Sequence, residues 1–187
     1  MRCLIVGASA SIAPDISDAF SKNGYEVISA FRKCGKNKAT KSISYSVSAD
    51  GSLKITNSSL VEELDVVIFC TGALIGKSVQ DYTISEMEKA FDANIVVVAK
   101  FIKHLLSKLN NNSSVVFISS ISASAGSYDE VYSASKSALY GLTKSLAKNT
   151  KNGARFNCVS PSLIKNSRMY NTFNKDEIET HISQTPT

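Results

Sequence analysis

This chain is poor in the residues that mark membrane, metal and disulfide proteins. It has no tryptophan, three prolines, two histidines and four cysteines in 187 residues. No apolar run approaches the roughly 20 residues that a membrane-spanning helix needs, so we expect no membrane association. The short apolar run at the N-terminus leads directly into a glycine turn, which favours a buried strand over a signal peptide.

Histidine and cysteine are too scattered for a metal site or a disulfide framework. His104 and His181 lie far from any clustered set of ligands, so we expect no bound metal. No two cysteines have the CxxC spacing, and three of the four lie in apolar, strand-like runs. We therefore expect reduced thiols in a cytoplasmic protein, at Cys3, Cys34, Cys70 and Cys158.

Positive charge exceeds negative charge, with 21 basic and 16 acidic residues and a formal net charge of +5. The basic residues are spread along the chain without a nucleic-acid motif, so we expect no nucleic-acid partner. One stretch differs, because no acidic residue lies between Val27 and Ala49. This stretch follows a predicted strand, where a cofactor phosphate can be bound, and its basic residues are Arg32, Lys33, Lys36, Lys38 and Lys41.

Apolar runs alternate with helical patterns along the chain, which is typical of an α/β fold. The length and a hydrophobic content of 43% fit one soluble domain, residues 1–187. We predict a doubly wound parallel sheet of about six strands with helices on both faces. The expected strands are residues 2–6, 26–31, 42–47, 65–70, 114–120 and 154–160.

Two long helical patterns follow, over residues 85–109 and 131–150. Thr83 and Glu86 have the spacing of a capping box at the start of the first helix. Both helices carry enough apolar residues to pack on the sheet and on a second subunit. We therefore expect a homo-oligomer, a dimer or tetramer.

The first strand ends in a glycine turn at Gly7, and the segment GASASIAPDISDAF then enters a helix that runs to about Asn23. Free N–H groups and the positive dipole end of such a helix bind phosphate without a basic side chain. Ser11 adds a hydroxyl that can donate to phosphate. An ordinary strand-to-helix turn has the same pattern, so both interpretations stay open.

The segment VVFISSISASAGSYDEVYSASK runs from a β-branched strand into a helix. Tyr132 and Lys136 are four residues apart and share one face of that helix. A free tyrosine has a pKa of about 10, and a nearby cation stabilises its phenolate, so the pair can act as an acid or a base. The strand ends in Ser119 and Ser120, of which strand alternation sends only one toward a substrate.

The pentapeptide YSASK, preceded by the strand end ISS, resembles the catalytic core of the short-chain dehydrogenase/reductase family, and nearly the whole chain follows that family's order of motifs. The resemblance implies a Rossmann-like oxidoreductase that transfers hydride between NADP(H) and a carbonyl or secondary alcohol substrate. It makes Ser120, Tyr132 and Lys136 catalytic, with Ser119 as the alternative serine. Asn94 matches an asparagine that in the family holds a proton-relaying water.

The resemblance also places a dinucleotide across the strand ends. Arg32 and Lys33 follow the second strand and favour NADP(H), with NAD(H) possible, because basic groups there accommodate a ribose 2′-phosphate. A solvated basic loop is the alternative interpretation of these two residues. The other implied cofactor contacts are Gly7, Ser9, Ser11, Ile12, Cys70, Thr71, Gly72, Asn94, Tyr132, Lys136, Pro161, Ser162 and Ile164.

The sequence departs from the family pattern at several of these positions. Ser11 and Ala13 replace two glycines of the turn TGxxxGxG, Cys70 replaces the asparagine of Asn-Ala-Gly, and Ser162 replaces a glycine. The chain also stops before the family's usual last helix and strand, so we expect a C-terminally short domain or a fragment. These departures favour the alternative of a non-catalytic dinucleotide-binding sensor or structural protein. A nucleotide-sugar epimerase or dehydratase needs a longer C-terminal domain.

Overall fold

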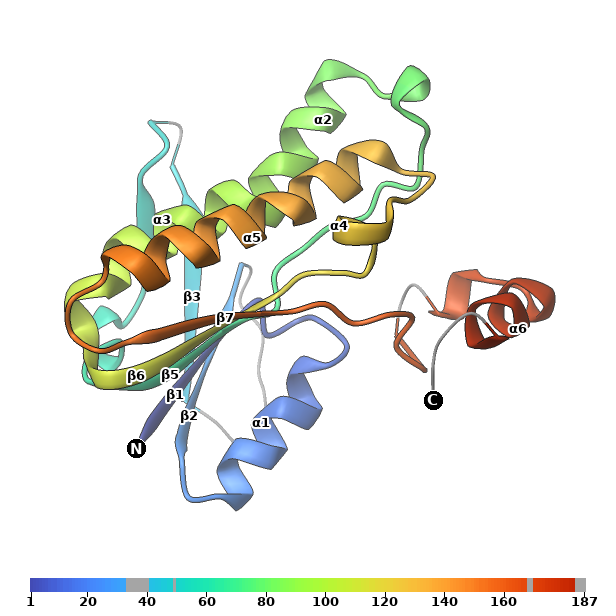
Figure 1. The fold of residues 1–187 in the computed structure, drawn as a ribbon. Coiled ribbons are helices and arrows are strands. Elements are labelled where there is room, and N and C mark those ends of the chain that lie inside the picture. The colour runs from blue at the N-terminus through green and yellow to red at the C-terminus, as the bar shows by residue number, and fades with distance from the viewer. Residues whose placement is uncertain (33–40, 49, 168–169, 184–187) are drawn as a thin grey trace.

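The computed structural model describes residues 1–32, 41–48, 50–167 and 170–183, so Lys33 lies outside the described residues. Its centre is a seven-stranded sheet in the order β4-β3-β2-β1-β5-β6-β7 (Figure 1). Every neighbouring pair is parallel except β3 and β4. The strands are β1 (Arg2–Val6), β2 (Glu26–Phe31), β3 (Lys41–Val47), β4 (Leu53–Ile55), β5 (Leu64–Phe69), β6 (Leu109–Ile118) and β7 (Arg155–Val159). The chain therefore has the predicted Rossmann-like α/β fold.

The sheet has seven strands, where about six were predicted. β4 pairs antiparallel with β3, with Tyr45 opposite Ile55 and Val47 opposite Leu53. No strand is among those predicted at residues 53–55, because three residues are too few to reveal an alternating apolar pattern. The addition lies at the β3 edge of the sheet, far in strand order from β6 and β7.

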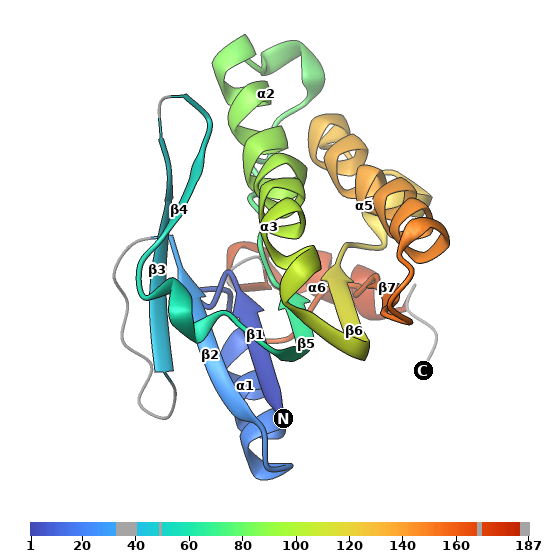
Figure 2. The ribbon, with the colours of Figure 1, turned by 90° about the vertical axis from the view of Figure 1, so that its left-hand side faces the viewer.

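Helices cover both faces of the sheet, as predicted (Figures 1 and 2). One face carries α1, and the other carries α5 beside the line formed by α2 and α3, which follow one another end to end. The helices are α1 (Ala13–Lys22), α2 (Ile84–Phe91), α3 (Val97–Leu105), α4 (Ser122–Ala125), α5 (Glu130–Asn149) and α6 (Lys175–Ser183). None of the helices among the described residues is long and apolar enough to cross a membrane.

The larger hydrophobic core lies between the sheet and α3 and α5. Phe69 of β5 stacks on Phe117 of β6 with 5.2 Å between ring centres, and Phe101 of α3 meets Phe69 edge-on at 6.1 Å. All three rings are buried. A smaller cluster lies under α1 and contains Cys3 and Cys70, whose pKa values burial raises to about 12. Thiols with such pKa values are protonated and unreactive at neutral pH.

The long helix predicted over residues 85–109 is interrupted in its middle. Thr83 and Glu86 form the expected capping box at the start of α2. Between α2 and α3 the chain forms a π-helical turn, Asp92–Val96, which widens the helix by its longer hydrogen-bonded ring. Such turns are rare and are often found at functional sites. This one contains Asn94.

The strand order reverses between β1 and β5, since the chain leaves β1 toward β2 and β3 and returns to β5 on the other side. Ligands of open α/β sheets bind outside the carboxyl ends of the strands at such a point. The segments that follow β1, β5 and β6 therefore frame the candidate site.

Candidate active site

Two glycines let the backbone segments after β1 and β5 approach each other closely. Gly7 has φ +83°, and a Cβ there would lie 2.8 Å from the backbone nitrogen of Thr71 and 3.0 Å from the carbonyl carbon of Cys70. A Cβ on Gly72 would lie 2.9 Å from both Asn94 Oδ1 and Lys136 Nζ. Only glycine fits either place without displacing a neighbour. Gly72 is therefore the point at which the β5 end, the π-helical turn and α5 meet.

Tyr132 and Lys136 lie on one face of α5, as the spacing predicts. Lys136 is buried, and its ammonium donates to the carbonyl oxygens of Thr71 at 3.1 Å and Ile118 at 2.9 Å. Its Nζ lies 6.0 Å from the centre of the Tyr132 ring. The lysine thus links the ends of β5 and β6 to the helix that carries the tyrosine.

The two serines at the end of β6 have different partners. Ser119 is buried and donates its hydroxyl to the carbonyl oxygen of Lys136 at 3.0 Å. Ser120 is half-buried and accepts from the N–H of Ser122 at 3.2 Å. Its hydroxyl also acts, through a side-chain hydrogen bond, to lower the pKa of Tyr132. The geometry therefore places the hydroxyl of Ser120, rather than that of Ser119, beside the phenol.

Asn94 is fully buried, and both polar atoms of its side-chain amide form hydrogen bonds with the backbone of one residue, Ala73. Its Oδ1 accepts from the N–H of Ala73 at 3.0 Å and its Nδ2 donates to the carbonyl of the same residue at 2.9 Å. This paired contact fixes the segment that begins at Gly72. The side chain thereby holds the backbone that adjoins Lys136.

Burial shifts the pKa values of the tyrosine and the lysine in opposite directions. It lowers the pKa of Lys136 from 10.5 to about 8, although the thiols of Cys158 and Cys70 act to raise it. It raises the pKa of Tyr132, against the hydrogen bond from Ser120 and together with the negative charge of Asp129. The expectation that Lys136 lowers the pKa of the phenol is therefore wrong for this structure, because the ammonium binds backbone carbonyls and burial dominates.

The turn after β1 leads to a helix N-terminus that has no side-chain cap. The N–H groups of Gly7 and Ala8 donate to the carbonyl of Ala30, each at 3.1 Å, and Ile12 occupies the N-cap position of α1. Ser9 and Ser11 are exposed on the turn. Both hydroxyls are therefore accessible, and the backbone donors of the first helical turn are not covered by a capping side chain.

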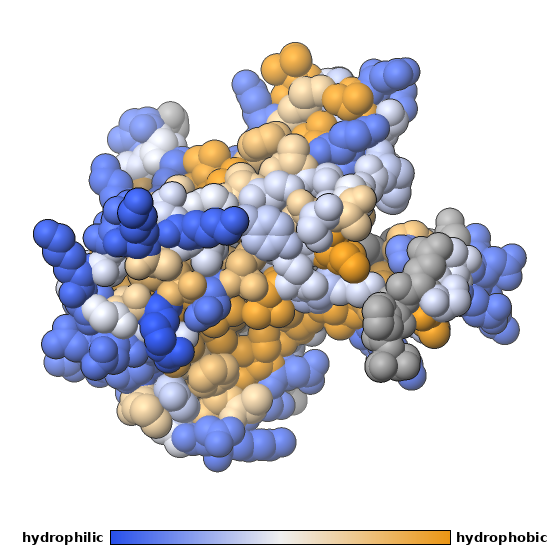
Figure 3. All heavy atoms as spheres, in the orientation of Figure 1, coloured by the Kyte–Doolittle hydropathy of each residue, from blue (hydrophilic) through white to orange (hydrophobic). Residues whose placement is uncertain are grey.

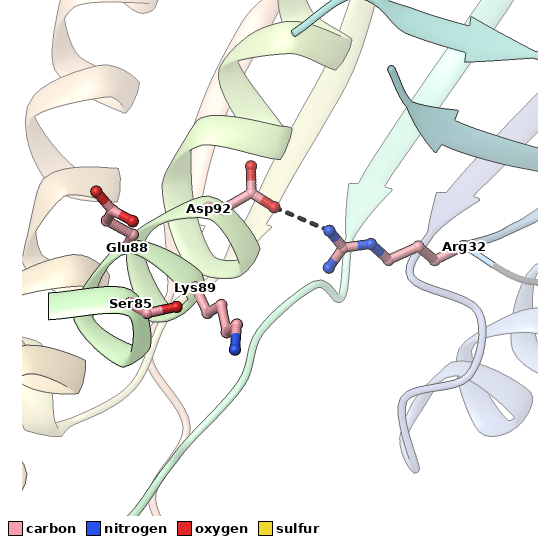
Figure 4. A pocket seen from close by; sticks show the side chains of 5 residues that line it. All are labelled: Arg32, Ser85, Glu88, Lys89 and Asp92. Atoms are coloured by element: carbon pink, nitrogen blue, oxygen red, sulfur yellow. Dashed lines mark hydrogen bonds and ion pairs between the residues drawn. The ribbon is translucent and has the colours of Figure 1, made fainter. Parts of the chain in front are cut away.

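Arg32 lies at the end of β2, away from the catalytic cluster. Its guanidinium forms an ion pair with Asp92 at 2.9 Å. The two side chains line an open pocket of about 290 Å³ together with Ser85, Glu88 and Lys89 of α2 (Figure 4). Asp92 is not predictable from the sequence as the partner of Arg32, because a carboxylate sixty residues away gives no local signal of such a pair.

The segment after β7 returns to the serines. Pro161 accepts from the N–H of Ile121 at 3.0 Å, and Val159 accepts from the N–H of Ser119 at 2.7 Å. Pro161, Ser162 and Ile164 are all half-buried. The structure thus brings Pro161 beside the end of β6, next to the segment that carries Ser120.

Sequence reasoning also missed a carboxylate beside this cluster. Asp129 is fully buried at the N-cap of α5, three residues before Tyr132. The hydroxyl of Tyr82 donates to it at 2.8 Å. An aspartate immediately before a helical pattern is a known start signal, and that signal was present in the sequence.

Comparison with known proteins matches this chain to one family model. The model is described as Enoyl-(Acyl carrier protein) reductase, and it matches residues 7–187. An uncharacterized oxidoreductase of Staphylococcus aureus (strain USA300) is 26% identical over 199 aligned positions, which cover 94% of this chain and 84% of that protein. (+)-Borneol dehydrogenase 2 of Salvia officinalis is 33% identical over 93 positions, 48% of this chain and 33% of that protein.

Solved structures share the fold at low sequence identity. A short-chain dehydrogenase/reductase of Brucella melitensis, described as a glucose/ribitol dehydrogenase, has a TM-score of 0.85 at 22% identity and covers 99% of this chain and 81% of that chain. The aldohexose dehydrogenase of Thermoplasma acidophilum has a TM-score of 0.77 at 24% identity and covers 98% and 77%. At these identities the likeness concerns the fold.

Proposed function

Because this chain belongs to the short-chain dehydrogenase/reductase family and is an oxidoreductase, we propose that it transfers hydride between NADP(H) and a carbonyl or secondary alcohol substrate. The family uses NAD(P) and acts on small molecules. The observation that carries the proposal is the convergence of Ser120, Tyr132 and Lys136 at the carboxyl ends of β5 and β6.

The residues around Gly7 and Gly72 fit a dinucleotide. A Cβ at either glycine would enter space already occupied by backbone or by Asn94 and Lys136, so both glycines are needed for the close packing of the segments that would border the cofactor. Among the described residues, the buried Thr71 Oγ1 has no hydrogen-bond partner, which leaves a donor in one of those segments. The uncapped N-terminus of α1 is suited to a pyrophosphate. In this proposal the pyrophosphate is held by Gly7, Ser9, Ser11 and Ile12.

The other proposed cofactor contacts lie on the remaining strand ends. Lys136 has three ammonium N–H groups and donates two to carbonyls among the described residues, which leaves one for a ribose hydroxyl. The segments that would border the nicotinamide and its ribose contain Cys70, Thr71, Gly72 and Asn94 on one side and Pro161, Ser162 and Ile164 on the other. When bound, the nicotinamide supplies or accepts the hydride.

We assign the proton to Tyr132. Its raised pKa keeps the phenol protonated at neutral pH, which is the form that donates a proton to a carbonyl oxygen during reduction. Ser120 donates a hydrogen bond to the same oxygen and stabilises the charge that develops on it. Lys136, with a pKa of about 8, is mainly cationic at pH 7, and in this proposal its ammonium helps to hold the cofactor rather than to acidify the phenol.

The cofactor preference follows from Arg32, in this proposal together with Lys33. The Arg32 guanidinium is largely exposed, and an exposed ion pair such as Arg32–Asp92 contributes only about 0–1 kcal/mol. A ribose 2′-phosphate can displace the carboxylate, since a phosphate accepts two parallel hydrogen bonds from a guanidinium. This supports NADP(H) over NAD(H).

Substitution of the tyrosine tests the proposed reaction. We expect Tyr132→Phe to lower kcat for carbonyl reduction by about 100-fold or more, because general acid catalysis contributes roughly that factor. NADPH binding, followed by fluorescence titration, stays close to that of the unmodified protein. Activity is measured as NADPH oxidation with a panel of aldehydes and ketones.

Tyr140→Phe is the matched control, since it removes a phenol hydroxyl that bonds to Ser160 at 2.7 Å on the same helix. It should leave turnover nearly unchanged. Undiminished turnover in Tyr132→Phe would rule out the assignment of the proton donor. NADPH binding without turnover of any compound in the panel would favour a protein that binds the dinucleotide without using it.

A further inference from the structure

The carboxylate of Asp129 receives an unusual number of hydrogen bonds for a helix cap. Oδ1 accepts from the backbone N–H of Tyr132 at 2.8 Å, and Oδ2 accepts from the N–H of Gly76 at 2.9 Å. The hydroxyl of Tyr82 lies 2.9 Å from Oδ1 and 2.8 Å from Oδ2. All of these groups are donors, which fits the ionised form that only accepts hydrogen bonds.

These bonds connect the floor of the active site to the helix that carries Tyr132. Gly76 and Tyr82 belong to the segment that starts at Gly72 and leads into α2. Tyr82 is itself buried in a small apolar cluster with Ala90 of α2 and Val131 of α5. The carboxylate therefore holds the start of α5 against the backbone that also contacts Lys136.

A helix cap alone does not require a buried charge. Serine or asparagine caps a helix about as well as aspartate. A buried carboxylate costs free energy unless its partners are all in place. Among the described residues no ion pair with a basic side chain neutralises Asp129, and only hydrogen bonds and the helix dipole compensate it. Because burying the carboxylate costs free energy that an uncharged cap would avoid, we infer that the charge of Asp129 has a role besides capping α5.

We propose that Asp129 is a positioning residue for Tyr132: it fixes the phenol relative to Ser120 and Lys136 and places a negative charge near it. This inference rests on the proposed role of Tyr132 as the proton donor. The charge opposes ionisation of the phenol, and burial acts in the same direction, whereas the hydrogen bond from Ser120 acts against both. Asp129 thereby extends to higher pH the range in which Tyr132 keeps its proton.

The other ionisable groups near the pair come from three segments. Lys136 faces the phenol from the next turn of α5. Tyr82 and Glu86 lie on the carboxylate side, at the start of α2, and Tyr128 lies in the loop before α5. Two lysines belong to this group: Lys136, which binds the carbonyls of Thr71 and Ile118, and Lys77, which pairs with Glu86 at 2.7 Å.

Asp129→Asn removes the charge and keeps a capping oxygen. We expect kcat to fall by up to about 100-fold, because small displacements of a catalytic group have effects of that size. The high-pH limb of the kcat profile moves to lower pH. The phenolate titration of Tyr132 moves the same way, and it is measured without cofactor by ultraviolet spectroscopy as the difference between each protein and its Tyr132→Phe form.

Glu130→Gln is the matched control. Glu130 is the next residue, is exposed, and accepts from the N–H of Val79 at 2.9 Å, so its substitution removes a neighbouring negative charge and keeps an oxygen that can accept from the same segment. It should leave the Tyr132 titration and the kcat profile unchanged. Equal effects of the two substitutions would show that Asp129 only caps α5. So would a loss of activity in Asp129→Asn that is the same at every pH and comes without a shift of the Tyr132 titration.

Tyr82→Phe tests the proposal if Asp129→Asn does not fold. It keeps the charge and removes one donor, so kcat should fall while the Tyr132 titration does not move to lower pH. Unchanged kcat in Tyr82→Phe would contradict the positioning role. Because the titration needs no turnover, a protein that reduces no carbonyl in the panel disproves the reaction while the effect of Asp129 on the phenol is still measured.

Discussion

At the residue scale, the sequence predicts which side chains meet but not how their pKa values move. The four-residue spacing of Tyr132 and Lys136 places both on one helix face, and the strand alternation sends Ser119 and Ser120 to different partners. The direction of the pKa shifts depends on burial, which tertiary packing decides. Asp129 was missed for a related reason, since its partners Gly76 and Tyr82 lie about fifty residues earlier.

Lys136 should make the stability of the protein depend on pH. Its folded-state pKa of about 8 lies below the value of 10.5 expected for the unfolded chain. Between these values the unfolded chain binds a proton that the folded protein does not, so the free energy of unfolding rises with pH in this window. We expect Lys136→Met to lose that rise in urea unfolding experiments at successive pH values. Lys144→Met, an exposed lysine of the same helix, serves as the control. If the free energy of unfolding changed with pH in the same way in all three proteins, the lowered pKa of Lys136 would be contradicted.

Asp92 should compete with a ribose 2′-phosphate for Arg32. Asp92→Asn frees the guanidinium, so we expect tighter NADPH binding and unchanged NADH binding. Arg32→Gln should weaken NADPH binding by about 10- to 100-fold, the value of a charge-assisted hydrogen bond. Fluorescence titration with both cofactors measures the two affinities.

Glu88→Gln is the control for this pair, because Glu88 lines the same pocket without being the partner of Arg32 in the ion pair (Figure 4). It should have a smaller effect than Asp92→Asn. A substitution at Arg32 that changes both cofactor affinities equally would remove the basis for the NADP(H) preference.

At the scale of elements, the apolar runs and the capping box predict the strands and helices, but short or irregular pieces escape. β4 has only three residues, and its strand conformation depends on pairing with β3. The π-helical turn at Asp92–Val96 has the same apolar composition as a regular helix, so periodicity does not reveal it. Its cause is tertiary: Asn94 is held by both backbone groups of Ala73.

The close approach of β1 and β5 can be tested by comparing two glycines. Gly7 and Gly24 have similar φ values of +83° and +78°, but a Cβ on Gly24 meets nothing within 4 Å, whereas one on Gly7 meets the backbone of Thr71 at 2.8 Å. We expect Gly24→Ala to cost about 1 kcal/mol of stability for its backbone conformation. Gly7→Ala should cost about 1–3 kcal/mol more, because backbone must shift. Urea unfolding measures both, and equal costs would contradict the crowding at Gly7.

At the scale of the whole molecule, the alternation of strands and helices predicts the sheet topology. It does not predict which apolar side chains stay exposed, because that depends on how far the helices cover each face of the sheet. The cluster under α1 includes Val116 and Ile118 of β6, which are only partly buried, and Val159 of β7 is 48% exposed. Figure 3 shows apolar side chains gathered on this side of the molecule, between β7 and α1. The face of the sheet toward α1 is therefore less covered at β6 and β7 than the face that packs against α3 and α5.

We propose that the protein self-associates through the helices on the opposite face. There α5 lies beside the line formed by α2 and α3 (Figure 2). Phe101 of α3 and Leu139 of α5 are buried in the core with side chains of the sheet. Phe91 and Val96 are instead 38% and 39% exposed. Single exposed apolar side chains are ordinary, but two on one helical segment, beside a second long helix, give a second packing stripe.

A charged group in that stripe should therefore separate the subunits. We expect the unmodified protein to sediment as a dimer or tetramer in analytical ultracentrifugation, and Phe91→Glu and Val96→Glu each to shift it to monomer, because a buried, unpaired carboxylate at an interface costs several kcal/mol. Ile182→Glu in α6, which is 61% exposed, is the control and should leave the assembly unchanged. Circular dichroism checks that the monomers stay folded. A monomeric unmodified protein would refute the proposal, and dissociation by Ile182→Glu alone would move the interface to α6.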